Sequence, residues 1–354
     1  MRQRVSQYLR PIAMTDPARP KGALRLAGGW GWFAQVEVLE RGRPAFVVPA
    51  GELDAAAQMR LSEARADFGD LAMDRPRIMG ILNVTPDSFS DGGLFLRPDA
   101  AVMAARRMAA AADILDIGGE STRPGAVFVD EAEEIGRTAP VISALRDGGL
   151  EVPISIDTRK AGVAAAAFAA GASILNDVTA LQFDAGMAGF AAANGCPVIL
   201  MHSLADPATM QDDPHYDDVL LDVFDALAAR VAEAVAAGIA RARIAIDPGI
   251  GFGKTLAHNL ALLNRLSLFH DLGQPVLLGA SRKRFIGTIG VGVGAGAGEA
   301  GAAGAAGAAK RMPGSLAVAL QGLAHGVQMI RVHDVAETRQ AVSLWLAVTK
   351  GEPR

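Results

Sequence analysis

The chain has 354 residues, of which 51% are hydrophobic and 20% are charged, with a formal net charge of −4 at pH 7. This composition is typical of a globular protein and excludes a disordered or fibrous chain, and no block of like charge indicates a nucleic-acid surface. No segment offers the roughly 18 apolar residues that a membrane span needs, and the amino terminus has no apolar export signal, which favours the cytoplasm.

Residues 1–76 predict a small α+β extension. A hairpin is expected from Trp32–Val38 and Pro44–Val48 around Gly42, followed by a helix over Leu53–Asp67. Nothing in this extension indicates its function.

Residues 77–354 predict a catalytic domain in which short apolar runs alternate with helical stretches. Their continuous apolarity is typical of parallel strands covered on both faces. Eight strand–helix repeats favour a closed (β/α)₈ barrel, a TIM barrel, over a long doubly wound sheet. The predicted strands are Arg77–Leu82, Ile114–Ile117, Pro153–Ile156, Ser173–Leu175, Pro197–Met201, Arg243–Ile246, Pro275–Leu278 and Val327–Ile330.

Several residues mark the expected helix ends. Asp99 is expected to cap the alanine-rich helix that follows it, and Asp130 with Glu133 resembles a capping box. Gly171 and Gly238 stand where helices are expected to stop.

Two glycine-rich segments need separate interpretation. The first, Gly249–Thr255, resembles a phosphate-binding loop, but it has the wrong spacing before Lys254 and a proline, Pro248, where the motif needs glycine. A nucleotide-binding function is therefore rejected. The second, residues 290–309, is almost entirely Gly and Ala and predicts a flexible loop insertion, with a frayed helix as the alternative.

Polar side chains follow every predicted strand. In a barrel these positions converge on one rim, where such enzymes place their chemistry. They are Asn83, Gly118–Glu120, Asp157, Asn176–Asp177, His202, Asp247, Ser281–Lys283, and Arg331 with His333.

Two carboxylates and an amide on this rim, Asp157, Asp247 and Asn176, suit a flat heterocycle such as a pterin. Each carboxylate can accept two parallel hydrogen bonds from adjacent N–H donors. The alternative is that either carboxylate only caps the next helix.

The basic side chains on the rim indicate an anionic substrate. Lys283 lies at a predicted helix start, where a cation opposes the helix dipole; a solvated helix start is the alternative. Arg331 and His333 point the same way if their strand continues through them. With Arg123 they predict a diphosphate clamp.

A long loop, Asn83–Gly93, is a candidate lid. Asn83 and Asp91 supply hard oxygen ligands that suit Mg²⁺, which bridges to substrate phosphates. A turn-forming surface loop is the alternative.

Six segments in order are similar to the signature segments of the dihydropteroate synthase family, a family of pterin-binding TIM barrels. The resemblance covers residues 77 to about 350, and the segments that carry it lie between Ile81 and Asp334. They are Ile81–Gly93, Asp116–Gly125, Ser155–Thr158, Asn176–Val178, Asp247–Lys254 and Arg331–Asp334.

The resemblance implies a transferase of folate biosynthesis. It joins 7,8-dihydropterin-6-ylmethyl diphosphate to 4-aminobenzoate and releases diphosphate, with Mg²⁺ as the cofactor, small-molecule substrates as partners and a homodimer as the assembly. It is also a sulfonamide target. The implied catalytic residues are Asp157, Lys283, Arg331 and His333. The implied pterin contacts are Asp157, Asn176, Met201, Asp247, Phe252 and Lys283, and the implied diphosphate contacts are Asn83, Thr122, Arg123, Arg331 and His333. Asn83 and Asp91 would face the metal.

The aminobenzoate ring would lie between Phe89 and Pro124, near Thr122. Its carboxylate would meet the helix start after Lys283. The chain departs from the family at Arg284, where a small hydroxyl residue is frequent, so a different side chain would meet the carboxylate here.

Two other functions compete with this one. A pterin-binding methyltransferase that serves a corrinoid protein would not need the diphosphate clamp. A catalytically silent paralogue is expected to have lost Asn83, Arg123, Lys283 or His333, and all four are present.

Overall fold

The computed structural model describes residues 7–85, 98–121, 128–204, 214–290, 307 and 310–351. Some of the predictions above fall on other residues. Outside the described residues lie Phe89, Asp91, Thr122, Arg123, Pro124 and nearly all of the predicted loop 290–309.

Eight parallel strands form a closed barrel, which confirms the predicted fold class. Each strand pairs with the next along the chain except β11 with β12, and the last strand, β13, pairs with the first, β6. A parallel bridge between Ile246 and Val276 joins the two remaining edges. The strands are β6 Arg77–Asn83, β7 Ile114–Gly118, β8 Ile154–Asp157, β9 Ile174–Asp177, β10 Val198–Met201, β11 Ile244–Asp247, β12 Leu277–Leu278 and β13 Met329–Val332.

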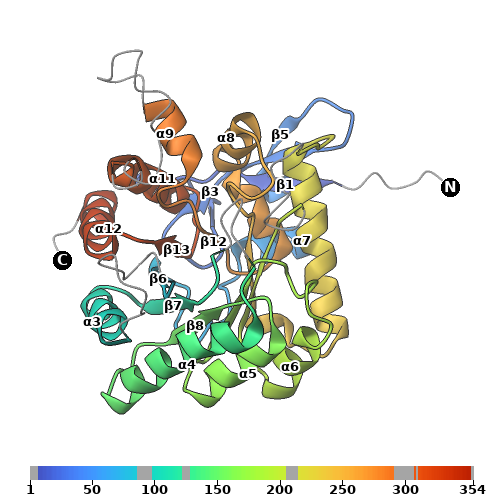
Figure 1. Ribbon diagram of the computed structural model, residues 1–354. Helices are drawn as coiled ribbons and strands as arrows, with labels where there is room; N and C mark the ends of the chain where they lie inside the picture. The colour runs from blue at the N-terminus through green and yellow to red at the C-terminus, as the bar shows by residue number, and fades with distance from the viewer. Residues whose placement is uncertain are drawn as a thin grey trace.

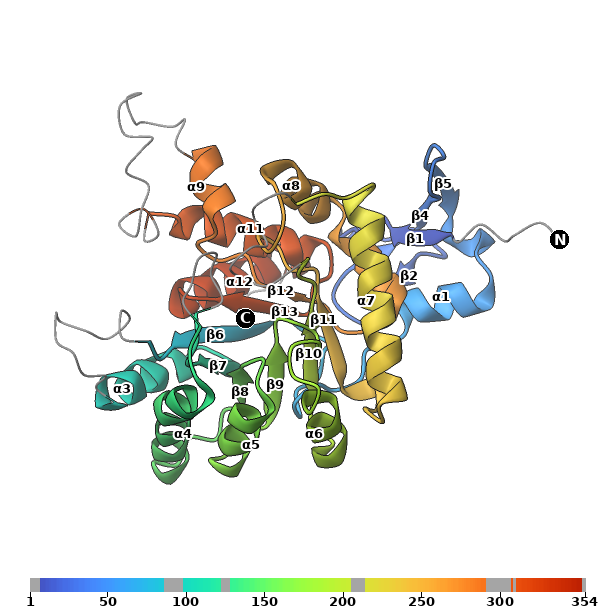
Figure 2. The ribbon, with the colours of Figure 1, turned by 45° about the vertical axis from the view of Figure 1, so that its right-hand side comes forward.

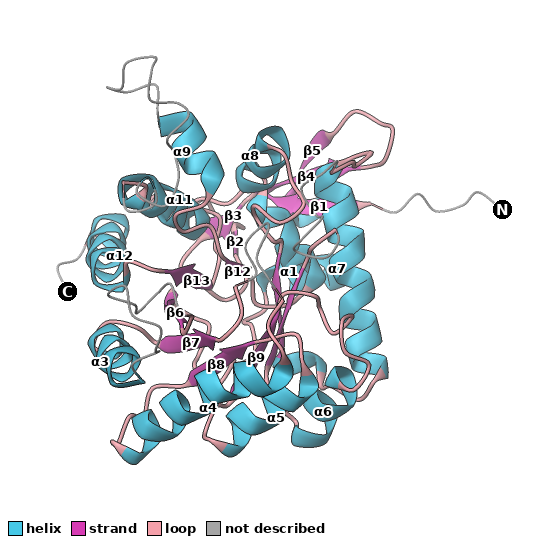
Figure 3. Ribbon diagram, viewed as in Figure 1, coloured by secondary structure: helices cyan, strands magenta, loops and turns pink. Residues whose placement is uncertain are grey.

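Helices form the outer layer around these strands (Figures 1 and 3). They are α3 Pro98–Ala109, α4 Glu131–Asp147, α5 Ala161–Ala169, α6 Met187–Asn194, α7 Val219–Ala236, α8 Leu256–Asn264, α9 Arg284–Gly290, α11 Met312–Ala324 and α12 Val335–Lys350. Two 3-10 helices, Arg241–Arg243 and Leu266–Leu272, precede β11 and β12. No helix in the described part of the chain is long and apolar enough to span a membrane.

The predicted helix stops are confirmed, but the predicted helix starts are wrong in detail. Gly171 and Gly238 follow α5 and α7 with φ angles of 111° and 99°, which favour glycine. Asp99 lies inside the first turn of α3, because the helix already begins at Pro98. Asp130 is the N-cap residue of α4, but its side chain makes no cap hydrogen bond. Glu133 instead pairs with Arg137 one turn later.

Two layers of side chains fill the barrel, because alternate residues of each strand point inward. The layer near the amino ends of the strands is apolar. It contains Met79, Ile114, Ile174, Ile199, Ala245, Leu277 and Met329, with Phe68 and Met73 packed against them. Two residues further along the same strands come Asp116, Asn176, Met201, Asp247 and Arg331. The apolar layer therefore forms the floor of a polar site.

The N-terminal module, residues 7–76, has more strands than the sequence predicts. Its sheet has the antiparallel order β1 (Tyr8–Pro11), β4 (Gln35–Leu39), β5 (Phe46–Pro49), and a second pair joins β2 (Leu24–Arg25) to β3 (Trp32–Phe33). The predicted strand Trp32–Val38 is thus divided at Ala34 between two sheets. A 3-10 turn, Ala50–Glu52, precedes helix α1 (Ala55–Ser62), which ends five residues before Asp67.

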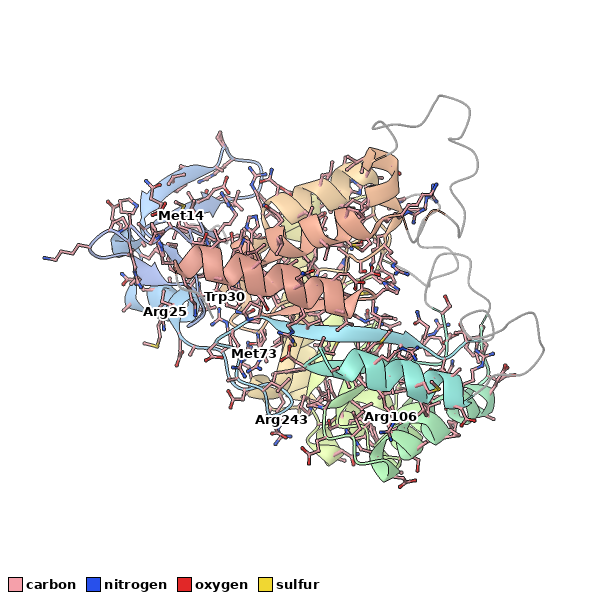
Figure 4. The ribbon with its side chains drawn as sticks, turned by 90° about the vertical axis from the view of Figure 1, so that its left-hand side faces the viewer. Met14, Arg25, Trp30, Met73, Arg106 and Arg243 are labelled. Atoms are coloured by element: carbon pink, nitrogen blue, oxygen red, sulfur yellow. The ribbon has the colours of Figure 1, made fainter. Side chains whose placement is uncertain are left out.

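This module packs against α7 and the 3-10 helix Leu266–Leu272, as Figure 2 shows. Arg41 forms ion pairs with Asp222 and Asp225 of α7, and Arg60 pairs with Asp271 at 2.7 Å. The indole of Trp30 donates to the carbonyl of Leu323 in α11 at 2.9 Å. Figure 4 shows Trp30 where the module meets the C-terminal helices. The module is therefore bonded to the barrel wall.

Phe68 connects the module to the barrel floor, and its replacement by alanine tests this role. Its side chain is 1% exposed among the first inward residues of the strands. We expect Phe68→Ala to lower the free energy of unfolding by about 3–5 kcal/mol through the cavity it leaves. Phe46, which is 47% exposed, is the matched control and should change that free energy by about 0.5 kcal/mol or less. Denaturant titration measures the free energy of unfolding of both variants. Equal losses of that free energy would contradict the role of Phe68 in the barrel floor.

Candidate active site

Arg331 lies at the centre of the polar layer and contacts two carboxylates from neighbouring strands. Its Nε donates to Asp116 Oδ2 and its Nη2 donates to Asp157 Oδ2, both at 2.5 Å. Asp116 is completely buried and Asp157 is 6% exposed. The planar guanidinium suits this bridge because its N–H groups diverge in a fixed plane. One cation is thus shared by two buried anions.

Asn176, on β9, extends this group. Its Nδ2 donates to Asp116 Oδ2 at 3.2 Å. Three buried oxygens beside it have no hydrogen-bond partner within the described residues, namely Asp116 Oδ1, Asp157 Oδ1 and Ser155 Oγ. Buried polar atoms are normally paired. The polar layer therefore has acceptors to offer to a ligand with N–H donors.

Asp247 and Met201 end the next two strands. Asp247 is 5% exposed, and its Oδ1 accepts the Gly249 N–H at 2.7 Å. Met201 is buried and pairs with Asp247 in the strand register. Both predicted pterin contacts therefore lie on adjacent strands at the carboxyl end of the barrel.

Lys283 follows β12 and contacts the glycine-rich loop after β11. Its Nζ donates to the carbonyl of Ile250 and lies 3.9 Å from the ring centroid of Phe252. An ammonium over an aromatic face is a cation–π contact. Lys283 thus lies against Phe252 and acts electrostatically on Asp247, and all three are predicted pterin contacts.

Burial acts on the pKa values of Asp157, Asp247, Lys283 and Arg331 in this pocket. Burial raises the pKa of Asp157, and the neighbouring Asp116 carboxylate raises it further against the opposing effect of Arg331. Burial also raises the pKa of Asp247 and lowers that of Lys283, although these two groups attract each other. For Arg331, burial alone would lower the pKa, but Asp116 and Asp157 outweigh it and raise the pKa. Arg331 is therefore the permanent cation of the site.

His333 lies one residue beyond the end of β13 at Val332, so the strand does not continue through both Arg331 and His333, which was the condition for their expected common direction. The His333 N–H donates to Ser281 Oγ at 3.2 Å, and its Nδ1 lies 3.1 Å from the same oxygen. Arg331 points into the barrel toward carboxylates. Asn83 is the half-buried last residue of β6, and Arg284 is the exposed first residue of α9.

Some of the polar residues that follow the strands stabilise the wall of the barrel. Glu120 forms buried ion pairs with Arg159 and Lys160 at 3.1 and 2.8 Å. Asp177 accepts the backbone N–H groups of Thr179 and Leu181. A polar residue that follows a strand can therefore be predicted to lie on the rim. Its position alone does not show whether it contacts a ligand or stabilises the barrel wall.

Asp116 is the site residue that had no predicted role. It belongs to a segment that resembles the family, but it lies inside an apolar strand rather than after one. The available signal was a carboxylate two residues after Ile114, in the inward-facing phase of the strand.

Comparison with known proteins identifies the group to which this site belongs. A family model described as Pterin binding enzyme matches residues 79–333. The chain is 44% identical over 285 residues to dihydropteroate synthase of Neisseria meningitidis serogroup B, covering 79% of this chain and 95% of the relative. The chain belongs to the dihydropteroate synthase family.

Two solved dihydropteroate synthase structures from Xanthomonas albilineans resemble this fold. One, with 4-aminobenzoic acid, has a TM-score of 0.71 and 45% identity, covering 80% of this chain and 97% of that chain. The other, in complex with 7,8-dihydropteroate, has a TM-score of 0.67 and 44% identity, covering 78% and 95%. The family match begins at Met79, so the N-terminal module precedes the part that matches the dihydropteroate synthase family model.

Proposed function

We propose that this chain condenses 7,8-dihydropterin-6-ylmethyl diphosphate with 4-aminobenzoate to give 7,8-dihydropteroate and diphosphate. The observation that carries the proposal is the buried Asp116–Arg331–Asp157 group with acceptor oxygens that have no partner in the described chain. In a member of the dihydropteroate synthase family, a pterin edge with adjacent N–H donors is the ligand that suits these acceptors.

The pterin would be held on one side of the barrel mouth. The oxygens of Asp157 and Asp247 would accept its N–H groups, and Asn176 would contact the ring edge. Lys283 would donate to a ring acceptor, while Phe252 and Met201 would cover the ring faces. This environment is apolar on the faces and charged at the edge, which suits a flat heterocycle.

The reaction breaks the bond between the methylene carbon and the diphosphate oxygen and forms a carbon–nitrogen bond to the amine of aminobenzoate. The amine lone pair supplies the new bond, the diphosphate leaves with the old bond pair, and the amine gives up one proton. Positioned cations lower the barrier by stabilising the leaving diphosphate. The guanidinium of Arg331 has five N–H donors, and the two contacts with Asp116 and Asp157 leave others for this task.

Mg²⁺ belongs to the same proposal. The described residues contain no group of three or more His, Cys, Asp or Glu side chains that could hold a metal ion. Mg²⁺ does not require one, because it is often held by one or two protein oxygens together with substrate phosphates and water. Asn83, at the end of β6, would supply one such oxygen, and the ion would neutralise charge on the diphosphate. A homodimer is proposed on the family resemblance.

Diphosphate release by the purified full chain, measured with dihydropterin-methyl diphosphate and Mg²⁺, tests the proposal. We expect dihydropteroate, identified by mass, only when 4-aminobenzoate is also present. Omission of each substrate in turn is the control. Dihydropterin binding without product would contradict the proposal and favour a silent paralogue or a methyltransferase.

A further inference from the structure

The glycine-rich loop after β11, residues 248–253, is held almost entirely through its backbone. The N–H of Gly251 donates to Asn259 Oδ1 at 2.6 Å, and the hydroxyl of Tyr216 donates to the carbonyl of Gly253 at 2.8 Å. Gly249, Gly251 and Gly253 have φ angles of 66°, 82° and 58°, which explains the alternating glycines. These contacts fix the path of the loop that carries Phe252.

Lys254, the lysine of the rejected nucleotide motif, also contacts the backbone of this loop, from a buried position. Its side chain is 4% exposed, so it does not reach toward solvent. Its Nζ lies 2.9 Å from both His202 Nδ1 and the Phe252 carbonyl, and 3.5 Å from the His202 carbonyl. An ammonium has three N–H donors, so these three acceptors match its capacity.

The Lys254 contacts join two predicted pterin-lining residues. One acceptor is the carbonyl of Phe252 itself, and the others belong to His202, which directly follows Met201. The loop and His202 are closely packed, because a Cβ added at Gly249 would lie 1.9 Å from the His202 carbonyl oxygen. A shift of this loop would therefore move Phe252 relative to Met201 and Lys283.

We infer that Lys254 and Tyr216 are positioning residues of the pterin pocket, which hold the adjacent carbonyls of Phe252 and Gly253 so that the Phe252 ring stays beside Lys283. The inference rests on the proposed function, because it assigns these two residues to the pterin side of that reaction. Neither side chain is required to touch substrate. Their effect on catalysis passes through the loop.

The pKa shifts of Lys254 and His202 agree with the positioning role of Lys254. Burial and the nearby charge of Lys254 lower the pKa of His202 to about 3, so the imidazole is neutral near pH 7 and its Nδ1 can accept a hydrogen bond. Burial also lowers the pKa of Lys254, and Lys283 lowers it further against the attraction of Asp247. A lysine kept in such a place needs compensating hydrogen bonds, which the two carbonyls and His202 provide.

Steady-state kinetics of Lys254→Met and Tyr216→Phe test the inference. Methionine nearly matches the length of lysine but has no donors, and phenylalanine removes only the hydroxyl. We expect the KM for dihydropterin-methyl diphosphate to rise roughly 10- to 100-fold in Lys254→Met and about 3- to 10-fold in Tyr216→Phe. The KM for 4-aminobenzoate should stay within about twofold, since the loop contacts the pterin side.

Arg77→Met is the matched control, because Arg77 is a buried cation at the opposite end of the barrel, where it donates to the Ala72 carbonyl. It should lower stability and leave the pterin KM unchanged. An unchanged pterin KM in Tyr216→Phe, or in folded Lys254→Met, would overturn the inference. So would an equal rise in both substrate KM values. Failure of the wild-type chain to form dihydropteroate would instead overturn the proposed function.

Discussion

Arg331→Ala is expected to lower kcat roughly 100- to 1,000-fold, the cost of removing one preorganised charge from a reaction in which anionic charge develops. The same change leaves Asp116 and Asp157 buried without their shared cation. Breaking a buried pair by removing one partner costs about 3–5 kcal/mol of unfolding free energy. Diphosphate release and denaturant titration on the same preparation would measure both losses.

Arg331→Lys separates charge from geometry, since lysine keeps the cation but cannot span two carboxylates with a fixed fork. We expect it to recover part of the stability and little of kcat. The loss of unfolding free energy in Arg331→Ala should also depend on pH. Arg331 opposes the raised pKa of Asp157, so its removal raises that pKa further. A carboxyl group whose pKa is raised in the folded state keeps its proton in the folded protein at pH values where the unfolded chain has lost it. The free energy of unfolding of Arg331→Ala therefore falls as pH rises from the unfolded-state pKa of Asp157 to its folded-state pKa. Intact turnover in folded Arg331→Ala would limit Arg331 to a structural role.

The barrel was predictable because its strands are short, continuously apolar and regularly spaced. All eight predicted runs contain strands, and no boundary differs by more than two residues, as in β13, which starts at Met329 rather than Val327. The polar rim followed from the same pattern. Asp157, Asn176 and Asp247 became the last or next-to-last residues of their strands and still point into the barrel mouth.

The remaining features depend on contacts between distant segments. The inward phase of its strand marks Asp116 only weakly, and its role becomes clear from its contact with Arg331, 215 residues later. The role of Lys254 depends on His202, 52 residues away, and the local sequence offered only a resemblance to a phosphate-binding loop, which its spacing excluded. The division of the N-terminal strand at Ala34 depends on separate partners for its two halves: β3 pairs with β2, while β4 pairs with β1 and β5. The local pattern of apolar and polar residues does not show which distant segments these residues contact.

Lys283→Ala is expected to lower kcat/KM for dihydropterin-methyl diphosphate roughly 10- to 200-fold, because it removes a charged hydrogen-bond donor worth about 1.5–3 kcal/mol. The loss should appear in binding of the pterin substrate, since Lys283 lies against Phe252 and acts on Asp247. Isothermal titration calorimetry measures the affinity for the pterin substrate, and steady-state kinetics measure kcat/KM. Unchanged pterin affinity would remove Lys283 from the site.

The charge-retaining variant Lys283→Arg adds a test through pH. Burial lowers the pKa of Lys283, so its ammonium loses the proton at a lower pH than an ordinary lysine does. If the protonated form binds the pterin, kcat/KM for that substrate falls as pH rises through this lowered pKa. Arginine stays protonated throughout, so the alkaline limb should move to higher pH in Lys283→Arg even if its maximal rate is lower. An alkaline limb at the same pH in both proteins would assign that limb to another group, and Lys283 would then act through its contacts with Ile250 and Phe252 rather than through its proton.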